Sequence, residues 1–225
     1  MSQAKITYVN GRGRAEVVRY VLSAVGIAFT EDFVEDADQF EDLRNSGKLI
    51  LRQLPLLEID GFVITQTEAM IRYIARNYNF YGSTEEDRIR CDMIYDGLKD
   101  AAIGVGGIGM EFQIGEEKEL RKEGMKQRMD KYFPMFEKML SGKQYFLGET
   151  LSFVDVVFLH DLEWLVDIFG ENVLDSYPEI KALQSRLQNL PNIKSYLSSE
   201  QKKSYPNADY IALVKNVFHG KPSKK

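Results

Sequence analysis

Tyr8 and Arg14 are the first residues in the chain whose types and spacing suit chemistry on an anionic group. They flank a glycine-containing turn, Asn10-Gly-Arg-Gly13. A tyrosine hydroxyl can donate a hydrogen bond to an anion without itself ionising, because its ordinary pKa is roughly 10. A nearby arginine lowers the pKa of an acidic ligand group. Each residue also has a simpler interpretation: Tyr8 as a strand residue in the core, and Arg14 as a solvated side chain in the first turn of a helix.

A second set of polar residues lies where the pattern indicates a strand edge and a helix start. Gln53 and Leu54 precede a predicted strand, and Gln66 and Thr67 begin a helical pattern. The free N–H groups and the dipole of a helix N-terminus suit a carboxylate. Taken alone, however, such a pair is more often an ordinary helix start.

The chain contains few side chains suited to metal binding or redox chemistry. Cys91 is its single cysteine, which excludes an intrachain disulfide and a cysteine-based metal cluster. His160 and His219 are too isolated in the sequence for a metal site, and we expect His160 to be a core residue with satisfied hydrogen bonds. The sequence therefore predicts no metal, an inert thiol and a reducing compartment such as the cytoplasm.

The elements that must position these residues follow an α/β pattern from residue 5 to about residue 80. Apolar residues recur at helical spacing after the first turn and end at Gly26, a plausible helix stop. Asp60-Gly61 separates two short apolar segments and favours a two-residue hairpin turn. The pattern predicts strands at 5–9, 29–34, 56–59 and 62–65, a short helix and loop at 35–47, and a helix from Thr67.

Helical patterns replace strand patterns from Thr84 onward. Apolar residues between Met129 and Leu140 form one stripe at three- and four-residue steps. Segment 156–169 is nearly continuous in apolar residues, so we expect a buried central helix there, with Ser152 and Asp155 as a capping arrangement at its start. The predicted fold is therefore an α/β domain over residues 1–82 followed by an all-helical domain over residues 83–225.

The order β-α-β then β-β-α, with Leu54-Pro55 before the third strand, is typical of thioredoxin-like domains, in which that proline is usually cis. A thioredoxin-like oxidoreductase would carry a cysteine at the end of its first strand. Tyr8 occupies that place here. Cysteine redox chemistry is therefore excluded.

Several short segments carry a family resemblance through their order and spacing. They are Tyr8-x-Asn-Gly-Arg-Gly-Arg14, Leu43-Arg-Asn-x-Gly47, Gln53-Leu-Pro-Leu-Leu-Glu-Ile-Asp-Gly61, Gln66-Thr67, Tyr73-Ile-Ala75, Tyr78-Asn-x-Tyr-Gly82, Tyr132-Phe-Pro134 and Ser152-x-x-Asp155. The chain resembles the cytosolic glutathione transferases over essentially its whole length. The alpha class is most similar, and the sigma class is second, chiefly through Arg12-Gly-Arg-Ala-Glu16.

The resemblance implies a glutathione transferase fold, with a thioredoxin-like N-terminal domain and an all-α C-terminal domain that carries most of the electrophile pocket. It implies a cytoplasmic, homodimeric transferase of detoxification that takes glutathione as co-substrate. The thiol of glutathione has an unperturbed pKa of roughly 8.5, so the enzyme must stabilise its thiolate. By resemblance Tyr8 has that catalytic role, and Arg14 lies near the sulfur.

The same resemblance implies contacts to the rest of glutathione, which carries two carboxylates, an ammonium group and a peptide-like backbone. Asp100 would reach the glutamyl ammonium of the neighbouring subunit. Lys131 stands where alpha-class members usually carry an arginine. A lysine keeps the positive charge but lacks the planar guanidinium of arginine. The other implied binding residues are Tyr8 for the sulfur, Arg44 and Gln53 for the glycyl carboxylate, Leu54 for the cysteinyl backbone, and Gln66 and Thr67 for the γ-glutamyl carboxylate.

Segment 208–219 has apolar residues at helical steps and resembles the lid helix of alpha-class enzymes. Such a helix would cover a hydrophobic substrate pocket, although an apolar helix face is more often plain core. The candidate pocket residues are Val9, Gly11, Met110, Val214 and Phe218.

Two features depart from the family pattern. Leu51 stands where alpha-class dimers insert an aromatic side chain into the partner subunit. Because leucine is smaller, we expect a weaker contact between the subunits at this position. Ile103-Gly-Val-Gly-Gly-Ile-Gly109 places four glycines in a helical region, where each costs roughly 1 kcal/mol relative to alanine. We expect a kinked or loosened helix and a wider pocket, the alternative being close packing of two helices across the glycines.

Composition limits the partners. A formal net charge of −5 argues against nucleic acid, which requires a basic face. No run of about 18 apolar residues is present, so we expect no membrane insertion, and the first residues lack the pattern of an export signal.

Three functions remain open at this stage. The leading one is conjugation of glutathione to electrophilic, hydrophobic compounds. An isomerase that uses the same thiolate on a ketosteroid or a prostaglandin precursor is the enzymatic alternative. A ligand-binding or lens-type protein without activity is the third, but such a protein has no need of the residues matched to glutathione.

Overall fold

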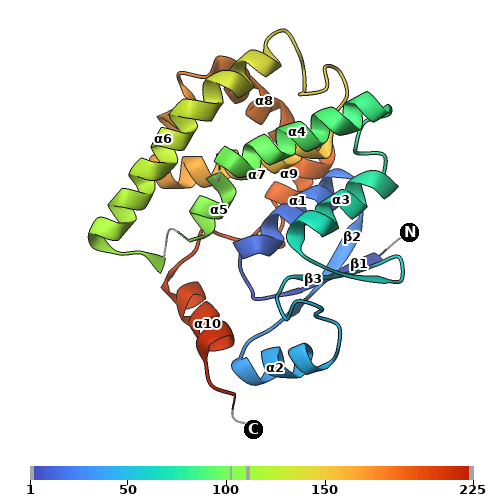
Figure 1. Ribbon diagram of the computed structural model, residues 1–225, viewed down its shortest axis with the longest axis vertical. Helices are drawn as coiled ribbons and strands as arrows, with labels where there is room; N and C mark the ends of the chain where they lie inside the picture. Colours follow the sequence, from blue (N-terminus) through green and yellow to red (C-terminus); the bar gives the residue numbers. More distant parts are fainter. Residues whose placement is uncertain (1–2, 102, 110–111, 223–225) are drawn as a thin grey trace.

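A four-stranded mixed sheet forms the centre of the N-terminal part of the molecule. The computed structural model describes residues 3–101, 103–109 and 112–222. Strand β1 pairs with β2 in parallel, whereas β3 pairs antiparallel with both β1 and β4. Helices α1 (Glu16–Ala24) and α3 (Thr67–Asn77) cover one side of the sheet, and α2 (Ala37–Asn45) lies on the other (Figure 1). The strands are β1 (Gln3–Tyr8), β2 (Ala28–Phe33), β3 (Leu56–Ile59) and β4 (Phe62–Thr65), in the spatial order β2-β1-β3-β4.

Local signals in the sequence account for this sheet. Of the apolar residues that predicted the first helix, Val17, Val18, Val21 and Leu22 are buried in α1, and Val25 follows its last turn. Asp60 and Gly61 have φ angles of +52° and +81°, because a two-residue hairpin turn of the mirror-image type needs positive φ at both central positions. The Leu54-Pro55 peptide bond is cis. The predicted hairpin and the predicted proline geometry are both confirmed.

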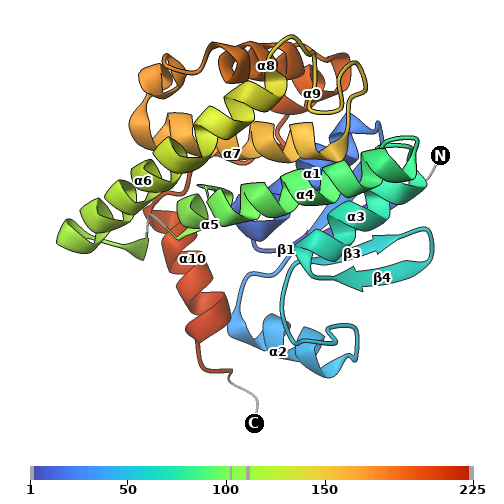
Figure 2. The same ribbon diagram turned by 45° about the horizontal axis from the view of Figure 1, so that its top comes forward.

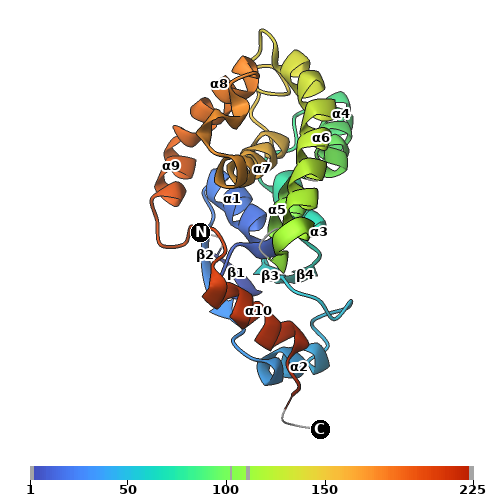
Figure 3. The same ribbon diagram turned by 90° about the vertical axis from the view of Figure 1, so that its left-hand side faces the viewer.

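Helices form the rest of the described chain. The long apolar helix α7 lies in the middle, with α4 and α6 on one side and α8 and α9 on the other (Figures 2 and 3). The helical elements are α4 (Glu85–Ala101), α5 (Ile103–Ile108), α6 (Gly115–Leu140), α7 (Phe153–Phe169), the 3-10 turn η3 (Glu171–Leu174), α8 (Pro178–Gln188), α9 (Pro191–Leu197) and α10 (Ala208–His219). This arrangement confirms the predicted fold class.

The central helix α7 begins at Phe153, directly after the predicted cap residue Ser152. Ser152 and Asp155 form a capping box, in which Asp155 accepts the backbone N–H of Ser152 at 2.9 Å. The box closes the first helical turn, so residues 153–155 belong to the helix. Asp155 also accepts the backbone N–H of Phe146 at 2.9 Å and thereby fixes the preceding loop.

The hydrophobic core continues from the sheet side of α1 into the helical part around α7. Tyr81 stacks on Phe153 with ring centroids 4.8 Å apart, and the backbone of Phe153 donates to the carbonyl of Phe80. The division into domains 1–82 and 83–225 therefore stays a prediction, because the two parts share one core.

The glycine run lies in α5, which packs against α7. A Cβ on Gly104 would lie 2.2 Å from a carboxylate oxygen of Asp161, and one on Gly107 would lie 2.6 Å from the ring of Trp164. The structure therefore shows the close helix packing that the sequence left as the alternative, since any side chain at these two positions would push the helices apart.

Helix α10 leaves the helical part and returns to the edge of the N-terminal part, beside α2 (Figures 1 and 3). Asn216 donates a side-chain hydrogen bond to the carbonyl of Glu35 at 3.2 Å, and the ring of Phe218 meets the ring of Phe40 edge-on. Within the described ranges, no helix combines the length and the apolar character needed to cross a membrane.

Candidate functional site

Tyr8 ends strand β1 with its ring almost completely buried, and its hydroxyl is the centre of the candidate site. The backbone N–H of Arg14 donates to the Tyr8 oxygen at 3.1 Å. Burial raises the pKa of Tyr8, while the Arg14 hydrogen bond, the charges of Arg19 and Arg14 and a hydrogen bond with Tyr210 lower it. The raised pKa means that the phenol keeps its proton at neutral pH. The Tyr8 hydroxyl can therefore donate a hydrogen bond to a ligand.

A cavity of about 570 Å³ opens beside this hydroxyl. It lies between the ends of β1 and α10, helix α2 and the start of α3. Its lining contains most of the residues that the sequence assigned to glutathione, brought together from distant parts of the chain. They are Tyr8, Arg14, Arg44, Gln53, Leu54, Gln66 and Thr67, and the cavity is also lined by Phe40, Arg52, Pro55, Glu68 and the predicted pocket residue Phe218.

Arg44 lines this cavity with a guanidinium whose N–H groups are only partly used in hydrogen bonds. Its guanidinium stacks over the ring of Phe40 at 4.0 Å and reaches Glu41 at 3.3 Å. Its Nε is buried and has no hydrogen-bond partner. A buried N–H left unpaired is costly, so this group favours an acceptor in the cavity. A carboxylate would suit it best, since arginine binds carboxylates through two parallel N–H groups.

Gln66 has a strained backbone at the start of α3, with φ of +69°. Such a conformation in a residue other than glycine costs of order 1–3 kcal/mol and is held only where surrounding contacts fix it. Its side-chain amide donates to Gln53 at 3.2 Å, which ties the two predicted contacts together. No side-chain cap bonds the first turn of α3, whose N–H groups therefore suit a carboxylate.

Leu54 and Pro55 precede the paired part of β3, where the ladder with β1 begins at Leu56. Both residues are buried, and both line the cavity. Backbone groups at such a strand edge can pair with an extended peptide as an added strand. The position suits the role that the sequence gave Leu54.

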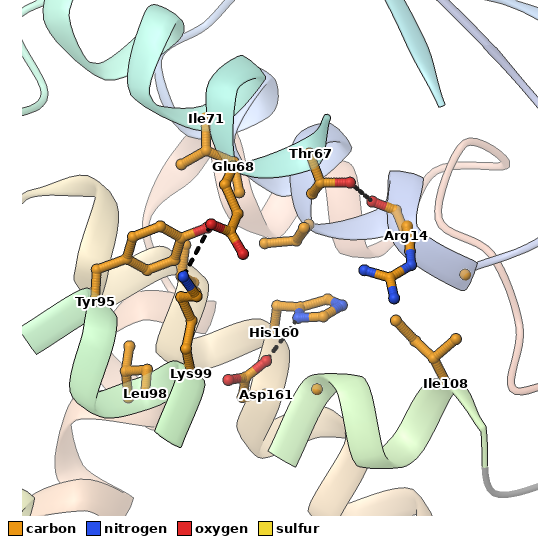
Figure 4. Close-up of a pocket in the computed structure, with 14 residues that line it drawn as sticks. Arg14, Thr67, Glu68, Ile71, Tyr95, Leu98, Lys99, Ile108, His160 and Asp161 are labelled. Atoms are coloured by element: carbon orange, nitrogen blue, oxygen red, sulfur yellow. Dashed lines mark hydrogen bonds and ion pairs between the residues drawn. The ribbon is translucent and has the colours of Figure 1, made fainter. Parts of the chain in front are cut away.

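Arg14 lies between the large cavity and a smaller one of about 90 Å³. Its guanidinium points into the smaller cavity, on the side of Ile108 and His160 (Figure 4). The hydroxyl of Thr67 donates to the Arg14 carbonyl at 3.1 Å and holds this turn against α3 (Figure 4). In this structure the backbone of Arg14, and not its side chain, makes the contact with Tyr8.

His160 and Cys91 behave as the sequence predicted. His160 Nδ1 lies 3.0 Å from Asp161, and the Trp164 indole donates to Nε2 at 3.2 Å, so both ring nitrogens are satisfied. Burial raises the pKa of Cys91 to about 12, which keeps the thiol protonated and unreactive. Among the described residues, no group of three or more His, Cys, Asp or Glu side chains could hold a metal ion.

The predicted apolar pocket is only partly assembled. Phe218 lines the large cavity, and Val214 is half-buried on α10. Val9 is fully buried and lines neither cavity, because neighbouring side chains in an extended segment face opposite ways and Tyr8 faces the cavity. Gly11 lies under the ring of Tyr210, and Met110 lies outside the described residues.

Asp100 and Lys131 lie apart from the large cavity, on α4 and α6, and both are exposed. This placement is compatible with their predicted roles only if a second subunit brings Asp100 to the site. Neither residue lines the cavity that contains Tyr8.

Among the residues at the site to which the sequence assigned no role, three stand next to Tyr8 or Gln53. Tyr210 contacts Tyr8 from α10, Arg52 lines the cavity beside Gln53, and Gly13 gives space to the Tyr8 hydroxyl. Arg52 had a signal, since it adjoins the predicted contact Gln53 and is cationic. Tyr210 had none, because its approach to Tyr8 depends on how α10 returns across the molecule.

The fold and the cavity define a two-part protein whose thioredoxin-like half carries a cavity beside a tyrosine hydroxyl. Family models for the glutathione S-transferase N-terminal domain and C-terminal domain match residues 4–76 and 108–200. The rat protein glutathione S-transferase alpha-4 is 37% identical over 218 residues, covering 95% of this chain and 97% of its own. Human glutathione S-transferase A1 is 36% identical, covering 90% of this chain and 91% of its own. The chain belongs to the glutathione S-transferase family.

Solved structures agree with this assignment. A glutathione S-transferase of the nematode C. elegans has a TM-score of 0.75 at 26% identity and covers 89% of this chain and 98% of its own. Prostaglandin synthase D of Nilaparvata lugens has a TM-score of 0.72 at 28% identity and covers 88% of this chain and 98% of its own.

Proposed function

We propose that this protein conjugates the thiolate of glutathione to electrophilic, hydrophobic compounds, with Tyr8 as the residue that stabilises the thiolate. The observation that carries the proposal is the gathering of Tyr8, Arg44, Gln53, Gln66 and Thr67 around one cavity. The alpha-class names of its relatives support the same activity.

The chemistry follows from the protonated state of Tyr8. The thiol of bound glutathione loses its proton to solvent, and the Tyr8 O–H donates a hydrogen bond to the sulfur anion. The sulfur then attacks an electrophilic carbon and forms the carbon–sulfur bond. With a chloronitroaromatic substrate, chloride leaves with the electrons of the carbon–chlorine bond, so the products are the conjugate, chloride and the proton released earlier.

The remaining contacts orient glutathione along the cavity. Arg44 and Gln53 hold the glycyl carboxylate, which is supported by the unpaired Nε of Arg44. Leu54 pairs with the cysteinyl backbone as an added strand. Gln66 and Thr67 hold the γ-glutamyl carboxylate at the N-terminus of α3.

We further propose that the protein is a homodimer, which would bring Asp100 of one subunit to the glutathione of the other. An apolar groove of about 320 Å³ lies between α4 and α6 and is lined in part by Met93, Met135 and Met139. Met93 is 70% exposed and Leu51 is 58% exposed, so both are open to burial by a second copy. Light scattering should give twice the chain mass, and Met93→Glu should shift the protein toward monomer. A monomeric mass for the wild type would overturn this part of the proposal.

A cytosolic location and a role for Lys131 complete the proposal. The buried free thiol of Cys91 supports a reducing compartment. Lys131 is exposed, and its ammonium lies 3.4 Å from the Tyr132 hydroxyl. Its proposed role is that of a point charge toward glutathione.

The test combines binding and turnover on the purified protein. Glutathione affinity is measured by calorimetry, and conjugation to a chloronitroaromatic compound is followed with mass detection of the product. We expect both. Tight binding of glutathione without conjugate formation would contradict the proposed reaction, and no binding would contradict the assignment of the cavity.

Glutathione-dependent isomerisation is the second candidate. It is favoured by the likeness to prostaglandin synthase D of Nilaparvata lugens. An isomerase returns glutathione unchanged, so incubation with a prostaglandin endoperoxide or a ketosteroid should yield an isomer and no loss of free thiol. A sulfur-containing adduct as the main product would count against it.

A further inference from the structure

Glu68 is an acidic residue at the candidate site that the proposed reaction leaves without a role. It follows Thr67 at the start of α3, and it lines both the large cavity and the smaller one. Among the described residues that line the large cavity it is the only carboxylate, whereas Arg14, Arg44 and Arg52 are cations. One acid among three cations suits a ligand that carries one positive group together with negative groups.

Ion pairs with neighbouring helices hold the Glu68 carboxylate in place. Its Oε2 atom lies 3.0 Å from the Lys99 ammonium on α4 (Figure 4). The same atom lies 3.8 Å from the Arg72 guanidinium, one turn further along α3. Within the described part of the chain, the other oxygen of Glu68 has no hydrogen bond or ion pair. That oxygen is therefore available to a donor in the cavity.

The chemical structure of the γ-glutamyl unit brings a donor to this place. The unit carries its carboxylate and its ammonium on the same carbon atom. The proposed site for the carboxylate is the N-terminus of α3, at Gln66 and Thr67. A carboxylate bound there leaves the ammonium beside the next residue of the helix, which is Glu68.

We propose that Glu68 binds the γ-glutamyl ammonium of glutathione within the same chain, so that the cavity selects ligands with an α-amino group. The inference rests on the proposed function, in which glutathione is the co-substrate. Asp100 of the partner subunit can contact the same ammonium, because that group has three N–H donors. Glu68 differs from Asp100 in that it needs no second subunit to reach the cavity.

The cations around Glu68 make this role compatible with a carboxylate bound next to it. An unpaired Glu68 would repel the γ-glutamyl carboxylate at the preceding residue, since like charges at short distance oppose each other. Lys99 and Arg72 offset that repulsion. Both contact Oε2 only, so they leave the acceptor capacity of the second oxygen intact.

The test compares two ligands that differ only in the amino group, namely glutathione and glutaryl-cysteinylglycine. Titration calorimetry measures the affinity of each ligand for the wild type and for Glu68→Gln, which keeps the size of the side chain and removes its charge. We expect the variant to lose about 3- to 10-fold in affinity for glutathione, as suits a charged pair that is partly open to solvent. Its affinity for the analogue should equal that of the wild type.

Glu86→Gln is the matched control. Glu86 also lies in the first turn of a helix, pairs with Arg90 at 2.8 Å and lines neither cavity. This variant should bind both ligands as the wild type does.

Two results would overturn the inference. Equal losses of affinity for the two ligands in Glu68→Gln would show that Glu68 only joins α3 to α4. Unchanged affinity of Glu68→Gln for glutathione would show that Glu68 does not contact the ammonium. In both cases the wild type still binds glutathione, so the proposed function stands, whereas a wild type that does not bind glutathione would overturn the inference and the proposed function together.

Discussion

The peptide N–H of Arg14 donates a hydrogen bond of 3.1 Å to the phenol oxygen of Tyr8. The contact is possible because Gly13, between them in the turn, has no side chain: a Cβ there would lie 2.3 Å from the same oxygen. Gly13 also has φ of +41°, a conformation that other residues rarely adopt. The turn after β1 therefore fixes a donor on Tyr8 and leaves the phenol proton available to a ligand.

Arg44→Ala should weaken glutathione binding roughly 10- to 100-fold, since a hydrogen-bonded pair with a charged group contributes about 1.5–3 kcal/mol. Titration calorimetry measures the change. Binding of γ-glutamylcysteine, which lacks the glycyl unit, should fall much less. Arg88→Ala, at an exposed position on α4, is the control and should bind both ligands normally. Equal losses for both ligands would show that Arg44 does not contact the glycyl carboxylate.

The glycines in α5 and α6 should respond oppositely to alanine. Gly107→Ala places a methyl 2.6 Å from the Trp164 ring and should destabilise the fold by about 1–3 kcal/mol. At Gly124 in α6 an added methyl would lie 3.5 Å from its nearest neighbour, which is an ordinary contact. Gly124→Ala should therefore stabilise the fold by about 0.4–1 kcal/mol, because alanine favours the helix. Urea unfolding measures both. Stabilisation by Gly107→Ala would show that α5 is not packed on α7 in solution.

Much of the fold followed from local signals that the chain carries at single positions. The Asp60-Gly61 hairpin and the Ser152–Asp155 capping box each depend on the chemistry of a few neighbouring residues. The glycine run shows the limit of such signals. Helix propensity treats each glycine as a loss, whereas Asp161 and Trp164, more than fifty residues further along the chain, make small residues necessary at two positions of the run.

In the candidate site too, the sequence revealed residues that carry a signal of their own and missed a residue placed by contacts with distant parts of the chain. Gln53 and Gln66 were found from family spacing, and their side chains meet in the structure. Tyr210 was missed because its neighbours Gly11 and Tyr8 are about two hundred residues away in the chain, and their meeting depends on the path of α10. The spacing of apolar residues predicted an apolar face on α10, but it could not show which part of the chain that helix would pack against.

Asp155 should make the stability of the wild type depend on pH. Burial raises the pKa of Asp155 to about 6, although backbone N–H groups of Phe146 and Ser152 favour its charged form. An unfolded aspartate has a pKa near 4, so the folded state binds this proton more tightly. The resulting stabilisation is fully present below about pH 4 and is lost as the pH rises through about 6.

Asp155→Asn does not titrate and supplies the reference for this effect. Between about pH 7.5 and about pH 4.5, the wild type should gain free energy of unfolding relative to the variant, by up to about 3 kcal/mol, because one pKa unit corresponds to about 1.4 kcal/mol. Urea unfolding at both pH values measures the difference. A relative loss by the wild type on acidification would mean that the hydrogen bonds lower the pKa of Asp155 instead.

The most direct test of the central claim is the rate of glutathione conjugation by wild type and Tyr8→Phe across pH, with saturating glutathione and a chloronitroaromatic substrate. Removing one hydrogen bond to a thiolate should raise the apparent pKa of the rate by roughly one to two units, since such a bond contributes about 1.5–3 kcal/mol. The account predicts a loss of about 10- to 100-fold at neutral pH, most of it recovered as the pH rises, with glutathione affinity unchanged. Equal rates for the two proteins at neutral pH, with glutathione bound in both, would contradict it.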